Sequence, residues 1–189
     1  MNAPTPDPLD VALAGLKAAI KTLDPKPQQI ITTWLMRWSN LLTREKGFDP
    51  AFLPYFKRGD IVYIDLGFNV GSEHGGVHYA VVYENNNGKR SKTVIVVPLS
   101  HVDNENHISK ADIYLGEGVI PWTPGIKTIA KPNQIRAVSK MRILKPLLAN
   151  DKVAKLKGEH LNAIDNRLKE LLLKPETVST PTTPNNRQQ

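Results

Sequence analysis

Between residues 60 and 145 the hydrophobic pattern has a period of two, and this feature limits the possible folds more than any other. Short runs rich in β-branched and aromatic residues alternate with clusters of glycine, asparagine and proline. The runs are IVYIDL (61–66), VHYAVVYE (77–84), TVIVVPLS (93–100), ADIYL (111–115), IRAV (135–138) and KMRILK (140–145). Alternation of this kind is typical of strands, and short turn-rich connections favour antiparallel neighbours. The pattern predicts a compact antiparallel barrel.

The connection between the first two runs combines backbone freedom with proton-transfer groups. Four glycines permit tight turns and a close approach of the backbone to a ligand: Gly67, Gly71, Gly75 and Gly76. The same stretch carries hydroxyl, carboxyl and imidazole side chains in Ser72, Glu73, His74 and His78. This combination indicates a functional site and not merely a loop.

Helical spacing of apolar residues flanks the β-rich region on both sides. Asp7 and Pro8 form a helix start, and two stripes that follow predict a pair of helices within residues 1–56. Trp34 and Trp38 are interpreted as core residues that seat the second helix, the alternative being an exposed groove for a partner. The expected organisation is this helical pair, a barrel at 57–146, a packed helix at 147–173 and a disordered tail at 174–189.

Composition restricts the class of protein. The 189 residues suit one main domain, and the 40% hydrophobic content fits a globular chain. No apolar stretch approaches the roughly 18 residues that cross a bilayer, so we expect a cytoplasmic protein without membrane contact. The chain has no cysteine, and His74 with His78 makes only a weak metal pattern, so neither a metal nor another cofactor is expected.

The net charge of +7 is concentrated in one part of the chain. Residues 118–146 contain no acidic residue and carry six cations, namely Lys127, Lys131, Arg136, Lys140, Arg142 and Lys145. Such a basic stripe would attract a phosphate backbone. An ordinary solvated edge that discourages strand-to-strand aggregation is the alternative interpretation.

An ordered series of short motifs resembles the MazF/PemK family of toxin endoribonucleases. The series is RGDI, DLG, GSE, GGV, AVV, an Asn, a Thr before VIVVPLS, and QIR at 134–136. It covers residues 57–146. The resemblance implies an SH3-like barrel of the PemK/CcdB plasmid-toxin type and a metal-independent, sequence-selective cleavage of single-stranded RNA that leaves cyclic phosphate and 5′-hydroxyl ends.

Two departures fall where the family's catalytic residues are expected. Typical members carry an Arg-Pro pair after GGV and a Thr at the end of the third strand. Here the matching positions are His78, Tyr79 and Ser100. Serine keeps the hydroxyl, whereas histidine replaces a permanent cation by a group that titrates near neutrality.

The expected catalytic residues are His78, Ser100 and Glu73. His78 would transfer a proton, Ser100 would donate a hydrogen bond to a phosphate oxygen, and Glu73 would orient His78 or accept a proton. As alternatives, His78 is a histidine satisfied between strands, and Glu73 pairs with Arg58 or Lys57. The expected RNA-binding residues are Arg58, His74, Tyr79, Lys89, Arg90, Lys131, Asn133, Gln134 and Arg136. Trp122 would stack a base or anchor its loop.

The resemblance also implies partners. We expect a homodimer, a cognate antitoxin, and contact with operator DNA only through that antitoxin. A catalytically inactive nucleic-acid-binding barrel, serving as a regulatory or interaction module, is the alternative, because loss of the family's Arg at position 78 is compatible with either function.

Overall fold

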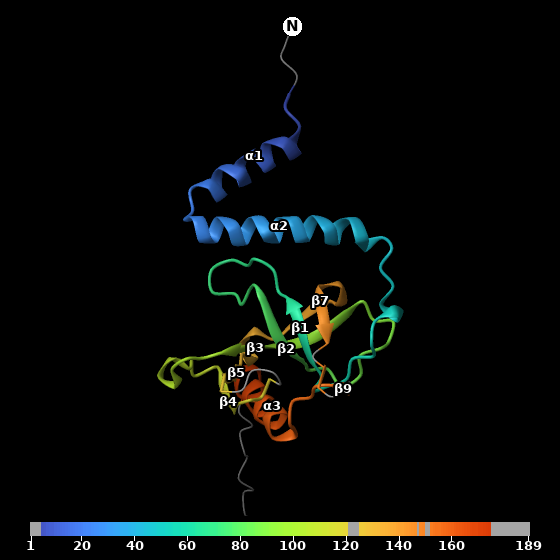
Figure 1. Ribbon diagram of the computed structural model, residues 1–189, viewed down its shortest axis with the longest axis vertical. Coiled ribbons are helices and arrows are strands. Elements are labelled where there is room, and N and C mark those ends of the chain that lie inside the picture. The colour runs from blue at the N-terminus through green and yellow to red at the C-terminus, as the bar shows by residue number, and fades with distance from the viewer. Residues whose placement is uncertain (1–4, 121–124, 147, 150–151, 175–189) are drawn as a thin grey trace, which may run out of the picture.

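Figure 1 shows the chain as a computed structural model, which describes residues 5–120, 125–146, 148–149 and 152–174. Two helices come first, α1 (Pro8–Lys21) and α2 (Pro25–Glu45). The Asp7 side chain caps α1 by accepting a hydrogen bond from the Leu9 amide, and Pro8 occupies the first turn, as the sequence predicts. Both predicted N-terminal helices are present.

Seven antiparallel strands form the main sheet. They are β1 (Ile61–Asp65), β2 (Val77–Val82), β3 (Thr93–His101), β4 (Ile113–Glu117), β5 (Lys127–Ala130), β6 (Arg136–Ser139) and β7 (Ile143–Pro146). Their order is β4-β5-β3-β2-β1-β7, and β6 also pairs with β3. A small ladder joins β8 (Leu148–Ala149) to β9 (Lys152–Val153). Four short 3₁₀ helices are η1 (Pro50–Phe52), η2 (Glu105–His107), η3 (Pro132–Gln134) and η4 (Lys140–Arg142).

The mainly β fold with appended helices is confirmed, but the barrel is not fully closed by hydrogen bonds. The first part of β3 pairs with β6, and its last residues pair with β5. β7 returns to β1 on the other edge. Among the described strands no ladder joins β6 to β7, because the chain passes between them through η4. The 3₁₀ turn η4 therefore connects β6 and β7 where a ladder between them would have closed the barrel.

Two hydrophobic clusters lie on the two faces of the sheet. Along β2, Ala80 and Val82 belong to the cluster that contains Phe56, while Val81 belongs to the other. The second cluster is covered by α3 (Gly158–Leu172), which buries Ile164 and Leu168 in it. The predicted C-terminal helix thus packs on the sheet, but its predicted start was wrong. The helix begins at Gly158, because Leu148–Ala149 and Lys152–Val153 pair as strands before it.

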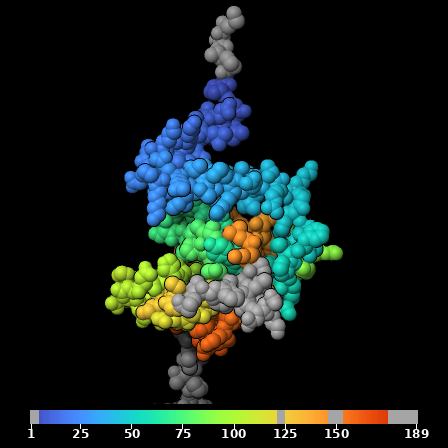
Figure 2. Space-filling model, in the orientation of Figure 1, coloured from blue at the N-terminus to red at the C-terminus, as the bar shows by residue number. Residues whose placement is uncertain are grey.

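The N-terminal helices are attached much less deeply. Figures 1 and 2 show α2 lying across the β1–β2 side of the sheet, with α1 stacked beyond it. α2 buries only Ile31 among its described residues, and α1 buries none. Trp34 is half-buried, as expected for a seating residue, whereas Trp38 is 46% exposed. Residues 175–189 of the predicted 174–189 tail lie outside the described residues, as does Trp122, for which base stacking or loop anchoring was predicted.

None of the helices in the described ranges has the length and apolar content needed to cross a bilayer.

Candidate functional site

The loop between β1 and β2 is closed at its base by glycines. The Leu66 amide donates to the Gly76 carbonyl at 2.8 Å, and the Gly76 amide donates to the Gly67 carbonyl at 2.6 Å. Gly67 and Gly76 have φ angles of +85° and +84°, a region that side chains disfavour. A Cβ at Gly75 would lie 2.7 Å from the Gly67 carbonyl oxygen. These glycines are therefore required by the tight return of the chain.

The loop delivers the chain to an open pocket of about 420 Å³ beside β2 and β3. Tyr79 pairs with Leu99, so the antiparallel register brings the neighbouring His78 and Ser100 together. Both line the pocket. The remaining lining residues are Tyr63, Val77, Tyr79, Leu99, His101, Ile120, Ile126 and Thr128. The two residues expected to carry the chemistry thus share one cavity.

His74 stands against His78 at the rim of this site. Their ring centroids are 4.2 Å apart, and the planes are inclined by 43°. His74 Nε2 is buried and has no hydrogen-bond partner within the described residues. Burial, followed by the charges of His78, Lys131 and Arg136, lowers the pKa of His74 to about 4. His74 is consequently neutral near pH 7.

The pKa of His78 is also lowered. Burial is the largest cause, the charges of His101 and Lys131 act in the same direction, and a hydrogen bond with the Gly75 backbone opposes them. A lowered pKa favours the neutral imidazole, which has one nitrogen free to accept a proton. His78 therefore has the protonation state that a general base needs at neutral pH.

Gln134 joins the loop to the second group of predicted RNA-binding residues. Its side-chain oxygen accepts hydrogen bonds from the His74 amide at 3.1 Å and from Arg136 Nη2 at 2.8 Å. Lys131 Nζ forms an ion pair of 2.9 Å with buried Asp112. Asn133 is exposed on η3. Gln134 thus contacts both His74 and Arg136 beside the pocket.

Tyr79 and Glu73 occupy different environments. The Tyr79 ring lines the pocket, with its centroid 4.9 Å from that of Tyr63. Glu73 is exposed in the loop turn. In the described part of the chain its carboxylate forms no ion pair, and Arg58 instead pairs with Asp165. The alternative pairing of Glu73 with Arg58 or Lys57 is therefore not found.

Three predicted RNA-binding residues lie away from this cluster. Arg58 donates to the Tyr83 carbonyl and to Asp165 of α3, and its guanidinium lies 4.1 Å from the Tyr83 ring centroid. Lys89 donates to the Leu53 carbonyl, and Arg90 is exposed in the β2–β3 hairpin loop. That hairpin loop is at the opposite end of β2 from His78.

Most cations of the basic stripe have partners on the protein. Lys127 pairs with Glu105 at 2.7 Å, and Lys140 is buried and donates to the Gly88 carbonyl at 3.1 Å. Arg142 donates to the Asp65 carbonyl at 3.3 Å. The cations are thus distributed over several local contacts, and the stripe does not form a single free surface.

Sequence reasoning missed part of the pocket wall and the residues that support the loop. His101, Tyr63 and Thr128 line the pocket, although only Ser100 was singled out on that part of β3. Strand alternation would put His101 on the face opposite Ser100, so the sequence pattern gives no signal that it shares the pocket. Arg37 of α2 binds Asp65 at the end of β1, with 2.9 Å between Nη1 and Oδ2. Nothing local in sequence connects these two residues.

Within the described ranges, no group of three or more His, Asp or Glu side chains is arranged to hold a metal ion.

Comparison with known proteins identifies the family. Residues 57–172 match the family model described as PemK-like, MazF-like toxin of type II toxin-antitoxin system. The chain is 31% identical over 115 residues to Endoribonuclease EndoA of Bacillus subtilis (strain 168), covering 59% of this chain and 90% of that protein. A solved structure of MazF from Deinococcus radiodurans has 14% identity and a TM-score of 0.48, covering 63% of this chain and 98% of the other. The family match includes β1 to β7, the site loop and α3, so the chain belongs to the PemK-like, MazF-like toxins of type II toxin-antitoxin systems.

Proposed function

We propose that this chain is a metal-independent endoribonuclease that cuts single-stranded RNA at selected sequences. The observation that most strongly supports this proposal is that His78 and Ser100 line the same pocket. They stand at the positions where the family has its Arg and Thr. Support also comes from the family membership and from the relative named as an endoribonuclease. RNA supplies its own nucleophile, the 2′-hydroxyl, so an acid–base pair and oxyanion donors are sufficient protein chemistry.

The proposed reaction is an in-line attack on one phosphate. Neutral His78 takes the proton of the 2′-hydroxyl, whose oxygen forms a bond to phosphorus. The bond from phosphorus to the 5′-oxygen breaks, and that oxygen takes up a proton from water, while protonated His78 returns its proton to water. The products are a 2′,3′-cyclic phosphate and a 5′-hydroxyl. Ser100 Oγ donates to a non-bridging oxygen where negative charge develops.

Glu73 completes the proposed catalytic set from the exposed side of the loop. Its carboxylate is free to accept a proton or to orient an imidazole once RNA fills the pocket, because no ion pair among the described residues occupies it. DNA lacks the 2′-hydroxyl and is not cut by this route.

In the proposed complex, RNA leaves the pocket along the surface formed by His74, Gln134 and Arg136. Arg136 and Lys131 supply positive charge, Gln134 and Asn133 supply amide groups, and Tyr79 supplies a ring face. His74 stays in the path as a neutral side chain. Arg58, Lys89 and Arg90 are proposed as contacts for more distant nucleotides.

We further propose that two chains form a homodimer and that an antitoxin holds the toxin inactive. That a protein of this family acts together with an antitoxin follows from the description of the family as toxins of type II toxin-antitoxin systems. Contact with operator DNA would occur through the antitoxin. The proposed division of the chain is a helical extension to residue 56, a toxin core at 57–146, a helix within 147–173 and a tail.

One observation favours a second function, that of a nucleic-acid-binding module without cleavage. The described lining of the His78 pocket contains imidazoles and hydroxyls but neither Arg nor Lys. A permanent cation would stabilise the phosphate charge in the transition state, and imidazole does so only when protonated.

A cleavage assay separates the two functions. Single-stranded RNA of mixed sequence is incubated with the protein in EDTA, and the product ends are mapped. His78→Ala should reduce the cleavage rate by about 10²- to 10⁴-fold with little change in RNA affinity. The matched control is His107→Ala, an exposed histidine in η2 outside the pocket. Unchanged cleavage by His78→Ala would refute its role, and intact RNA that binds the native protein would support the module.

A further inference from the structure

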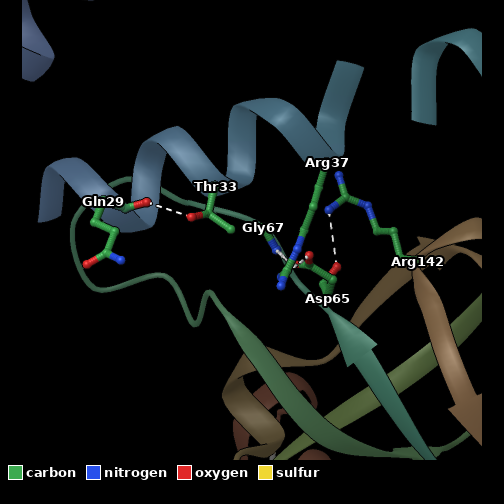
Figure 3. A network of polar contacts seen from close by, with 6 residues as sticks. All are labelled: Gln29, Thr33, Arg37, Asp65, Gly67 and Arg142. Atoms are coloured by element: carbon green, nitrogen blue, oxygen red, sulfur yellow. Dashed lines mark hydrogen bonds and ion pairs between the residues drawn. The ribbon is translucent and has the colours of Figure 1, made fainter. Parts of the chain in front are cut away.

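A chain of polar contacts links the N-terminal helix α2 to the start of the site loop (Figure 3). Arg37 Nη1 lies 2.9 Å from Asp65 Oδ2, and the side chain of Asp65 is only 7% exposed. The other carboxylate oxygen of Asp65 accepts a hydrogen bond of 2.9 Å from the Gly67 amide. A helix outside the toxin core thus neutralises a buried carboxylate at the point where β1 becomes the loop.

Close packing restricts Gly67 in the same place. A Cβ at this glycine would lie 2.9 Å from Trp34 Cζ2 and 3.0 Å from Arg142 Nη1. Arg142 also lies over the Trp34 ring, 5.0 Å from its centroid, and donates to the Asp65 carbonyl. The base of the loop is therefore enclosed between α2 and η4, and a shift of α2 would displace Gly67.

Gly67 is connected in turn to His78. The Gly67 carbonyl accepts the Gly76 amide at 2.6 Å, and a Cβ at Gly76 would lie 3.6 Å from His78 Nε2. In the β1–β2 ladder Ile64 pairs with His78, one position from Asp65. Few contacts separate the helix from the imidazole: the Arg37–Asp65 ion pair, the hydrogen bond from the Gly67 amide to Asp65, one main-chain bond and close packing.

We propose that Arg37 is a positioning residue: through Asp65, Gly67 and Gly76 it holds the His78 imidazole in its productive place beside Ser100. The N-terminal helices then support the active site directly. This inference rests on the proposed ribonuclease function for its kinetic part. Its structural part, that Arg37 orders the loop base, holds independently of that function.

Positioning and direct RNA contact predict different kinetics for Arg37. A positioning residue acts on the geometry of the reacting groups, so its loss lowers kcat and leaves KM nearly unchanged. A side chain that contacts RNA phosphate would raise KM and reduce the salt dependence of binding. The Arg37 side chain is 48% exposed, so it could reach RNA as well as position the loop. The kinetic assay separates these two roles.

The kinetic test compares three full-length variants with the native protein. Arg37→Ala should lower kcat by about 10- to 100-fold with KM changed less than about threefold. Arg37→Lys keeps the charge and one donor and should recover part of the loss. Arg44→Ala removes the same charge from an exposed position of α2 and should leave kcat unchanged. Unchanged kcat in Arg37→Ala, or a rise in KM alone, overturns the inference.

Hydrogen exchange without RNA tests the structural part. The Gly67 and Gly76 amides are bonded at the loop base, and Arg37→Ala should make both exchange at least about tenfold faster than Arg44→Ala does. Equal exchange in the two variants overturns the inference. If the native protein does not cut RNA, the proposed function fails, while exchange still decides whether Arg37 orders the loop. If Arg37→Ala does not fold, Arg37→Gln, which removes the charge and keeps much of the side-chain length, takes its place in the comparison.

Discussion

The two helices that pack against the sheet, α2 and α3, are attached in opposite ways, although each uses one arginine–aspartate ion pair. α3 buries Ile164 and Leu168 in the core, and its Asp165 binds Arg58. α2 buries only Ile31 among the described residues, and its Arg37 binds Asp65. Buried apolar area determines how much a helix stabilises the fold, whereas the place of its contacts determines what it can influence. By this measure α3 is part of the core and α2 is a support for the loop.

The largest expected difference between the helices is in stability. Leu168→Ala should lower the free energy of unfolding by about 2 to 5 kcal/mol, because it removes a buried side chain from the core cluster. Leu42→Ala, at a leucine of α2 that is 52% exposed, should change it by less than about 0.5 kcal/mol. Urea unfolding of both variants measures the two values. Similar losses would show that α2 is integrated as deeply as α3.

Much of this arrangement was predictable because it is local in sequence. Period-two runs located six of the seven strands of the main sheet, and helical stripes located all three helices, since each pattern depends on neighbouring residues. The strand β5 (Lys127–Ala130) lies outside the predicted runs and was missed. The double pairing of β3 and the 3₁₀ closure between β6 and β7 were not predictable, because they depend on long-range register. The apolar stripe of α2 was expected to be buried, yet the helix lies over a polar, glycine-rich loop.

The candidate site divides in the same way. His78 and Ser100 come from adjacent antiparallel strands, so motif positions alone were enough to expect them together, and the structure places both in one pocket. Their catalytic roles stay predictions. The Arg37–Asp65 pair joins residues 28 positions apart, and neither has a local signature. Contacts of this kind become visible only when the helix is placed on the sheet.

A smaller effect tests the ion pair of α3. The pKa of Asp165 is lowered: burial acts to raise it, but hydrogen bonds from Tyr83 and Arg58 and the Arg58 charge outweigh that. A lowered carboxyl pKa contributes stability above the unfolded value of about 3.9, and that contribution is lost as pH falls through the folded pKa. Asp165→Asn should cost about 1 kcal/mol at pH 7, reduced by the partial exposure of the pair, and less at pH 3. Urea titrations of the native protein and Asp165→Asn at pH 7 and pH 3 measure this cost. An equal cost at both pH values would contradict the role of the ionised Asp165 carboxylate.

The smallest effect lies on the loop side and in a different pH range. His74 is held neutral with a pKa of about 4, lowered first by burial and then by the charges of His78, Lys131 and Arg136. Its unfolded pKa is about 6.5, so the unfolded state binds the proton first, and native stability falls as pH drops from 6.5 to 4. His74→Gln cannot titrate, so its stability should fall less over that interval, the remaining slope coming largely from His78, whose pKa is also lowered. Thermal unfolding at pH 7, 5.5 and 4.5 provides the comparison, with Asp165→Asn as the matched variant on the α3 side. A shallower loss in Asp165→Asn than in the native protein across this range would contradict the assignment of the two regions, since the α3 contact should respond only in stronger acid.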